Sequence, residues 1–294
     1  MKKTLGFFLI AALLSGMFFP GMAVSADAVT EKPYLSLGAD LNPSEKTKVL
    51  ELLGVGSDLD GYNVGTVTNE EEHEYLGDYV SASVIGTRAL SSVLVITDEE
   101  GSGINVETSN ITYCTSGMYR NALVTAGISD ATVKVAGPFN LTGTAALVGA
   151  MKAYESMTGE VISEESKDAA TNELVATGEI AGSLGDKDKA EQLLALIKEK
   201  VVAGNLTEDE IIDAIDDACK ELEVHLSEED RQLIRDLMEK ISKLDLDTNK
   251  LKEQAGEVYD KLVDMGIDLK SESFWQSVKD FFVKIIDAIS GLFR

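Results

Sequence analysis

The amino-acid sequence predicts an α+β or α/β protein, in which an N-terminal layered domain with a mixed β-sheet precedes a C-terminal α-helical bundle. Three observations lead to this prediction. Between residues 34 and 158, short β-branched runs alternate with helix-like stretches, which is typical of a sheet covered by helices. From about residue 160, apolar residues recur at helical spacing and the connections are short, which indicates antiparallel helices. The chain ends in an aromatic-rich amphipathic segment.

The start of the chain has the pattern of a secretory signal peptide. Two lysines precede an almost wholly apolar stretch at residues 5–19, and Ala26 ends a cleavage site of small residues. The rest of the chain contains no long uncharged apolar segment, so we expect no transmembrane segment in the mature protein. We predict four parts: a signal peptide at 1–26, a mixed α/β domain at 27–159, an acidic helical domain at 160–270 and an amphipathic helix at 271–294.

The mature chain is strongly acidic. The whole chain has 26 basic and 51 acidic residues, and removal of the leader with its two lysines leaves 24 against 51, a net charge of −27. A field of that sign repels nucleic acid and anionic lipid, because both are themselves polyanionic. We therefore expect no nucleic-acid partner.

The elements of the N-terminal half follow from local signals. Residues 34–37 are strand-like, and Asn42, followed by a proline, caps a helix that stops at Gly54. Asn69, with Glu72 three residues later, predicts the start of a second helix.

Two further strand-like runs flank a turn of acidic residues and glycine. Residues 93–96 and 103–113 therefore predict a β-hairpin. The alternation of the second run slips between Val106 and Ile111, which predicts a bulge or a twist. We expect a helix at about 118–126, a strand at 131–135 and a further helix after it.

In the helical half, two pairs of residues have capping-box spacing. They are Thr207 with Glu210 and Ser227 with Asp230, and each predicts a helix start. The apolar residues after these starts lie at helical spacing: Ile211, Ile212, Ile215, Ala218, Cys219 and Leu222, then Leu233, Ile234, Leu237, Ile241 and Leu244.

The segment PFNLTGTAALVGAMKAYE, residues 138–155, places strand, turn and helix in the order that phosphate-binding loops use. The P-loop pattern is not met, because no lysine comes directly after Gly143. A helix start with free N–H groups remains, and it either attracts an anion or is capped by a side chain, with Thr142 as the expected cap. The candidate residues for a polar or anion site here are Asn140, Thr142, Gly143 and Thr144.

Other candidate polar residues lie elsewhere in the first domain. Ser91 enters the strand at 93, and Glu71, Glu72 and His73 lie in an acidic run. If these segments converge with residues 138–144, they form a polar cleft that suits a hydrolase or a transferase. The alternative is that the hydroxyls only support local structure, and no motif supplies partners for a catalytic histidine. The catalytic residues, if there are any, stay unknown.

The sequence predicts neither a metal site nor a cofactor. The chain has two cysteines and two histidines, and their spacing matches no ligand set. A calcium-loop pattern begins at Asp245 but has Lys250 and Gly256 where a glycine and a glutamate belong. Pairing of Cys114 with Cys219 stays open, because the sequence does not show whether they lie close together.

The last 24 residues form an amphipathic stripe. Its main apolar residues are Phe274, Trp275, Phe281, Phe282 and Ile285. Such a helix either lies on a membrane surface or partner, or closes the protein's own bundle.

Several segments together resemble the YpuA-like family, secreted proteins of Gram-positive bacteria that carry a domain of unknown function. These segments are LGADLNPSEK, TVTNEEEHEYL, IGTRALSS and GINVETSNITYCTSGMYRNALVTAGISDATVKVAGPFNLTGTAALVGAMKAYE. The part from Asn110 to Glu155 is the most specific. The resemblance implies export and a shared architecture, and it brings no established reaction, cofactor or catalytic residue.

We therefore expect a secreted or extracellular protein, associated with the cell wall or the outer face of the membrane. Its expected function is non-enzymatic binding or interaction at the cell envelope, with the cell wall, a membrane surface or another envelope protein as partner. The alternative is a hydrolase or transferase that acts on an envelope polymer.

Overall fold

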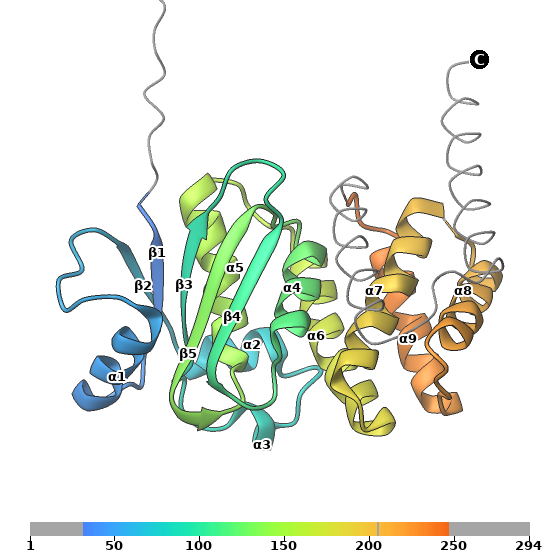
Figure 1. Cartoon of the computed structure of the whole chain (residues 1–294), viewed down its shortest axis with the longest axis horizontal. Helices are drawn as coiled ribbons and strands as arrows, with labels where there is room; N and C mark the ends of the chain where they lie inside the picture. The colour runs from blue at the N-terminus through green and yellow to red at the C-terminus, as the bar shows by residue number, and fades with distance from the viewer. Residues whose placement is uncertain (1–31, 205, 247–294) are drawn as a thin grey trace, which may run out of the picture. The chain divides into compact units, whose positions relative to one another are not determined.

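A mixed sheet of five strands forms the centre of the N-terminal half in the computed structural model, which describes residues 32–204 and 206–246 (Figure 1). The strand order is β2-β1-β3-β5-β4. The outer pairs β1–β2 and β4–β5 are parallel, whereas β3 is antiparallel to both of its neighbours. The strands are β1 (Tyr34–Gly38), β2 (Asn63–Val67), β3 (Ser92–Thr97), β4 (Ile104–Ile111) and β5 (Ala131–Leu141). The predicted mixed sheet followed by helices is confirmed.

The predicted hairpin of residues 93–96 and 103–113 is wrong, because β5 lies between β3 and β4. The connection between these strands passes around the start of β5. Asp130 holds it there: its carbonyl accepts from Asp98 N at 2.7 Å, and its carboxylate accepts from Gly101 N and Gly103 N at 3.0 Å. Six connecting residues easily span the roughly 9–10 Å between next-nearest strands. The predicted irregularity in β4 is confirmed, because the register shifts between Ser109 and Ile111.

The two faces of the sheet carry different helices. Helix α1 (Pro43–Leu53) packs on β3 and β5, where Leu35, Leu50 and Leu94 belong to one apolar cluster. On the other face lie α2 (Asn69–Leu76), the short α3 (Ala82–Ile85), α4 (Ser116–Thr125) and α5 (Thr144–Thr158), which share a larger cluster with the inner strand residues. Helix α1 has the predicted cap at Asn42 and ends at Gly54.

Helix α5 lies close to the centre of the sheet because small residues face each other there. A Cβ added at Gly149 would lie 2.8 Å from Ser36 Oγ and 3.0 Å from Val93 Cγ1. The alanine-rich composition of this helix therefore reflects packing against β1 and β3.

The helical half consists of α6 (Glu164–Leu184), α7 (Lys187–Gly204), α8 (Glu208–Glu221) and α9 (Glu228–Ile241), around a second apolar cluster. Both predicted capping boxes are confirmed. Helix α6 contributes to both cores, since Leu174 belongs to the first and Ile180 to the second. The division into domains near residue 160 stays a prediction. The signal peptide at 1–26 and the helix at 271–294 lie outside the described residues.

A buried polar seam joins α4 to α6 and α7. Lys198 and Glu173 form an ion pair at 2.9 Å with both side chains fully buried. Thr125 of α4 donates to the same carboxylate, and Asn121 donates through Nδ2 to Glu191 O at 3.0 Å. We refer to these residues, Asn121, Thr125, Glu173, Glu191 and Lys198, as the polar seam. Since apolar packing alone is not directional, these bonds fix how the helices meet.

The two cysteines are free and buried in different apolar clusters. Burial raises the pKa of the Cys114 thiol to about 12, so this thiol stays protonated. The question of a bridge to Cys219 is thereby answered: the two residues do not pair.

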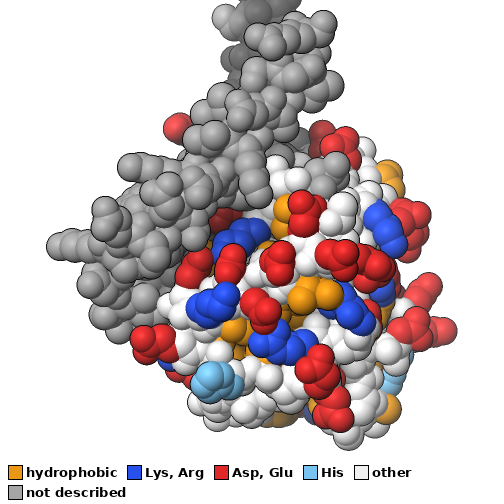
Figure 2. All heavy atoms as spheres, turned by 90° about the vertical axis from the view of Figure 1, so that its right-hand side faces the viewer, with side chains coloured by type: hydrophobic (Ala, Val, Ile, Leu, Met, Phe, Trp, Pro, Cys, Tyr) orange, Lys and Arg blue, Asp and Glu red, His pale blue; other side chains and the backbone are white. Residues whose placement is uncertain are grey.

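The face of the helical half is charged but mixed in sign. Figure 2 shows acidic and basic side chains interspersed there, with small apolar areas between them. Ion pairs between helices of this half include Lys200 with Glu221 at 3.0 Å, Arg231 with Asp216 at 2.5 Å and Lys240 with Asp168 at 3.0 Å. Those pairs that are exposed to solvent add little stability, about 0–1 kcal/mol each.

Candidate functional site

A pocket of about 340 Å³ lies where α2, the segment around α3 and the end of β5 meet. This volume is in the range of about 300–1,000 Å³ that is usual for small-molecule sites. The pocket is lined by Glu72, Val84, Ile85, Gly86, Thr87, Arg88, Leu90, Ser91, Phe139, Leu141, Thr142 and Thr144. Four of the residues singled out in the sequence, Glu72, Ser91, Thr142 and Thr144, therefore meet around one hollow.

The junction between β5 and α5 depends on Gly143. This residue caps α5 with φ +100°, in the left-handed region that favours glycine. A Cβ there would lie 2.5 Å from Tyr119 Oη. The same tyrosine hydroxyl donates to the carbonyl of Gly143 at 2.5 Å, so α4 fixes the turn from beneath. Gly143 thus shapes the junction through its backbone.

The expectation that Thr142 caps α5 is wrong. The cap residue is Gly143, and no side chain of the turn itself bonds to the helix start. The Thr142 hydroxyl lies 3.4 Å from the Thr144 hydroxyl instead. Gly143 has the left-handed backbone that this turn requires, but it has no side chain with which to cap the helix. The capping groups therefore come from other segments of the chain.

Two residues far away in sequence cap α5. Ser91 Oγ accepts from Ala146 N at 3.0 Å, across 55 residues of chain. Glu72 accepts from the Thr144 hydroxyl at 2.5 Å and from the backbone N–H of Ala145. The helix start that resembled an anion site is thus occupied by the protein's own carboxyl group and hydroxyl.

The Glu72 side chain lies deep in the pocket wall. The residue is only 2% exposed. Burial raises the pKa of its carboxyl, although the bonds from Thr144, Asn69 and the Ala145 N–H act in the opposite direction. Glu72 faces inward because α2 begins one residue earlier than predicted. The capping box is Thr68 with Glu71, so the expected box of Asn69 with Glu72 is wrong.

The other predicted residues of the acidic run have separate roles. Glu71 completes the cap of α2 and forms an ion pair with Lys152. Although burial opposes the shift, hydrogen bonds from Lys152 and Thr68 lower the pKa of Glu71. His73 Nε2 lies 3.2 Å from the carbonyl of Gly86, behind the pocket wall. Asn140 is exposed and is not among the residues that line the pocket.

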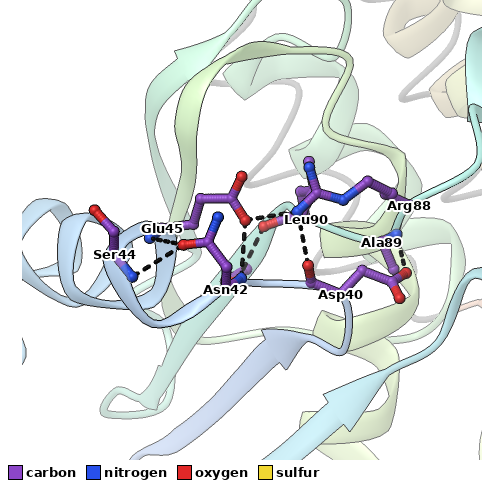
Figure 3. Close-up of polar contacts among 8 residues, drawn as sticks. Asp40, Asn42, Ser44, Glu45, Arg88, Ala89 and Leu90 are labelled. Atoms are coloured by element: carbon purple, nitrogen blue, oxygen red, sulfur yellow. Dashed lines mark hydrogen bonds and ion pairs between the residues drawn. The ribbon is translucent and has the colours of Figure 1, made fainter.

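Arg88 is a pocket residue that the sequence analysis missed. Figure 3 shows its guanidinium pointing toward the start of α1, where it donates to Glu45 at 2.6 Å and to the carbonyl of Asp40 at 2.8 Å. The bond from Arg88, together with the Asn42 N–H, lowers the pKa of Glu45. The Asp40 carboxylate accepts from Ala89 N at 2.8 Å. The available signal was that Arg88 is the one charged residue between Asp78 and Asp98.

Phe139 is the second lining residue that the sequence analysis missed. Its side chain is 49% exposed, although phenylalanine is usually buried. It lies near the end of β5, at the mouth of the pocket. The local signal was an aromatic residue close to the run of small and polar residues at 142–144.

The described part of the chain shows neither a bilayer-spanning helix nor a metal cluster. Within residues 32–204 and 206–246, every helix is too short or too polar to cross a membrane. In the same ranges, no three His, Cys, Asp or Glu side chains lie together as a set of metal ligands. The calcium-loop pattern that begins at Asp245 extends beyond the described residues.

Comparison with known proteins gives the family but no activity. The family model described as "Protein of unknown function (DUF1002)" matches residues 37–258. The chain is 40% identical over 296 residues to the uncharacterized protein YpuA of Bacillus subtilis (strain 168), and the match covers 100% of each chain. No solved structure matches the chain.

Proposed function

Because the chain belongs to the DUF1002 family, whose function is unknown, we propose a function from the pocket itself: the protein is an exported, envelope-associated binding protein that holds a ligand beside Glu72. The observation that carries this proposal is the convergence of Glu72, Ser91, Thr142 and Thr144 around one open hollow. The signal-peptide pattern of residues 1–26 supports export.

The hydrogen bonds of the pocket favour binding over catalysis. A nucleophilic hydroxyl needs a base within hydrogen-bond reach, but Ser91 Oγ accepts from the helix start at Ala146. The nearest histidine in the acidic run, His73, is directed to a backbone carbonyl. Polar groups that are already held by the fold form a rigid surface for a ligand, because little entropy is lost when the ligand binds.

The proposed partner is the cell wall, the membrane surface or another protein of the envelope. The mature chain is acidic, so its net charge repels polyanions, attracts cationic components and does not oppose the approach of uncharged ones. The aromatic segment with Phe274 and Trp275 is a second proposed contact, by the sequence argument alone.

The test is co-sedimentation of purified mature protein, residues 27–294, with isolated cell wall and with liposomes. Phe139→Ala is the pocket variant, and Val161→Ala, at an exposed residue outside the pocket, is the matched control. We expect sedimentation with the cell wall that Phe139→Ala weakens and Val161→Ala preserves. Equal sedimentation of both variants, or none of the wild type, contradicts the proposal.

One observation favours the alternative, a hydrolase or transferase on an envelope polymer. A buried carboxyl group with a raised pKa in a pocket is the usual form of a general acid, and Glu72 has both properties. The test is to incubate the purified mature protein with a set of envelope polymers and look for turnover. If turnover is found, Glu72→Gln should abolish it while the variant still binds the polymer. Turnover that persists in Glu72→Gln would show that Glu72 is not the general acid, and absence of turnover by the wild type on every envelope polymer would remove this alternative.

A further inference from the structure

We propose that the pocket beside Glu72 takes an uncharged sugar unit of an envelope polysaccharide. This inference rests on the proposed function, since it names the class of ligand for the same pocket. Four properties of the pocket support it: an exposed aromatic ring, a set of hydroxyl groups, a buried carboxyl and a guanidinium whose charge is already compensated.

The aromatic ring is that of Phe139. It is 49% exposed at the pocket, whereas most large apolar side chains of the described residues are buried. An exposed ring offers a flat apolar face that is negative at its centre. The C–H-bearing face of a sugar ring is apolar and slightly positive, so the two surfaces are complementary. Leu90 and Leu141 extend the apolar part of the lining.

The hydroxyl groups of the pocket match the rim of a sugar ring. Thr87, Ser91, Thr142 and Thr144 all line it. A hydroxyl has one donor and two acceptor positions, so each position that the fold leaves open can bond to a sugar hydroxyl. The Thr144 hydroxyl gives its hydrogen to Glu72 at 2.5 Å, which leaves its oxygen as an acceptor.

The charges of the pocket select against an anion. Arg88 lines the pocket, but its guanidinium already pairs with Glu45 at 2.6 Å and bonds to Asp40 O at 2.8 Å. The α5 start is already occupied by Glu72. An anionic ligand would therefore meet a second carboxyl and the net negative field of the chain, and the one cation among the described lining residues, Arg88, is already paired. A neutral ligand meets no such barrier.

The experiment is calorimetric titration of the full mature protein with three probes: a tetramer of N-acetylglucosamine, a tetramer of glucose and inorganic tripolyphosphate. We expect saturable binding of at least one sugar tetramer and none of tripolyphosphate. Phe139→Ala should weaken that binding tenfold or more, because the stacking face is lost. Val161→Ala, also an exposed apolar residue, should leave it unchanged. Equal melting temperatures of the two variants would show that both fold.

The outcomes separate this inference from the proposed function. If tripolyphosphate binds and the sugars do not, the ligand class is wrong. If none of the probes binds but cell wall still sediments the protein in a Phe139-dependent way, the ligand class is again wrong and the binding function stands. If the wild type does not sediment with cell wall at all, the proposed function fails and the inference fails with it.

Discussion

Lys198 Nζ lies 2.9 Å from Glu173 Oε1, and both side chains are completely buried between α4, α6 and α7. Lys198 also donates to the carbonyl of Asn121 at 2.9 Å, and Thr125 donates to Glu173. Burial favours the neutral form of each partner, raising the pKa of Glu173 and lowering that of Lys198, while their mutual attraction opposes both shifts. The pair therefore specifies one arrangement of three helices more than it adds stability.

Replacing one partner of this pair should be strongly destabilising. Lys198→Met leaves the Glu173 carboxyl buried without its cation, so we expect a loss of about 3–5 kcal/mol in the free energy of unfolding, measured by urea denaturation. The double variant Lys198→Met with Glu173→Leu removes both charges and should recover much of that loss. A double variant as unstable as the single one would contradict this interpretation.

Replacing glycine by alanine should have opposite effects on stability at two helix positions, one packed against the sheet and one open to solvent. Gly149→Ala places a Cβ 2.8 Å from Ser36 Oγ, so it should destabilise the protein by about 1–3 kcal/mol. Gly182→Ala in α6 meets nothing within 4 Å and should stabilise it by about 0.5–1 kcal/mol, because alanine favours a helix. Thermal unfolding of both variants tests this, and a shift of the same sign in both would be against it.

The caps of α5 predict different effects at two pocket hydroxyls. Ser91→Ala removes the acceptor of the Ala146 N–H and should cost about 0.5–2 kcal/mol of stability. Thr142→Ala removes a hydroxyl whose nearest polar partner is Thr144 at 3.4 Å, so its cost should be close to zero. Denaturant unfolding measures both values. If Thr142→Ala is the more harmful change, the assignment of the cap to Ser91 is incorrect.

The raised pKa of Glu72 predicts how stability depends on pH. Below pH 4.5 the carboxyl is protonated in both folded and unfolded chains, so it opposes folding least. As the pH rises from 4.5 through the raised folded-state pKa, the unfolded chain ionises first and the folded chain loses stability relative to it. Wild type should therefore lose stability over this range relative to Glu72→Gln, which has no proton to release.

Unfolding of both proteins in urea between pH 4 and pH 8 would check this prediction. A difference that stays constant over the range, or that grows in favour of wild type, would count against a raised pKa.

Local signals in the sequence predicted the helices well, because their determinants lie within one turn of each other. The Asn42 cap with Glu45, the stop at Gly54 and the boxes at Thr207 and Ser227 are all of this kind. The presence of a mixed sheet covered by helices followed from the alternation of strand-like and helix-like runs. Its strand order did not, because Asp130, which holds the β3–β4 connection around β5, is distant in sequence from that connection.

The site was predictable only in part, for the same reason. The sequence identified Glu72, Ser91, Thr142 and Thr144 as candidate polar residues. It did not show that Glu72 and Ser91 cap the helix that begins at Thr144. Those contacts span 72 and 55 residues of chain. Arg88 and Phe139 were missed because their importance comes from where the fold places them rather than from a motif.

The central position of β3 also decides the order in which this chain can fold. β3 pairs with β1 on one side and with β5 on the other, so the middle of the sheet needs segments from both ends of the N-terminal half. Such non-local pairings form slowly, because long loops must close first. During synthesis from the N-terminus, the apolar cluster of the β1–α1–β2 unit therefore stays incomplete until residues 131–141 are available, because Ala136 of β5 belongs to it. A nascent chain that stops before Ala131 has no complete sheet to fold into.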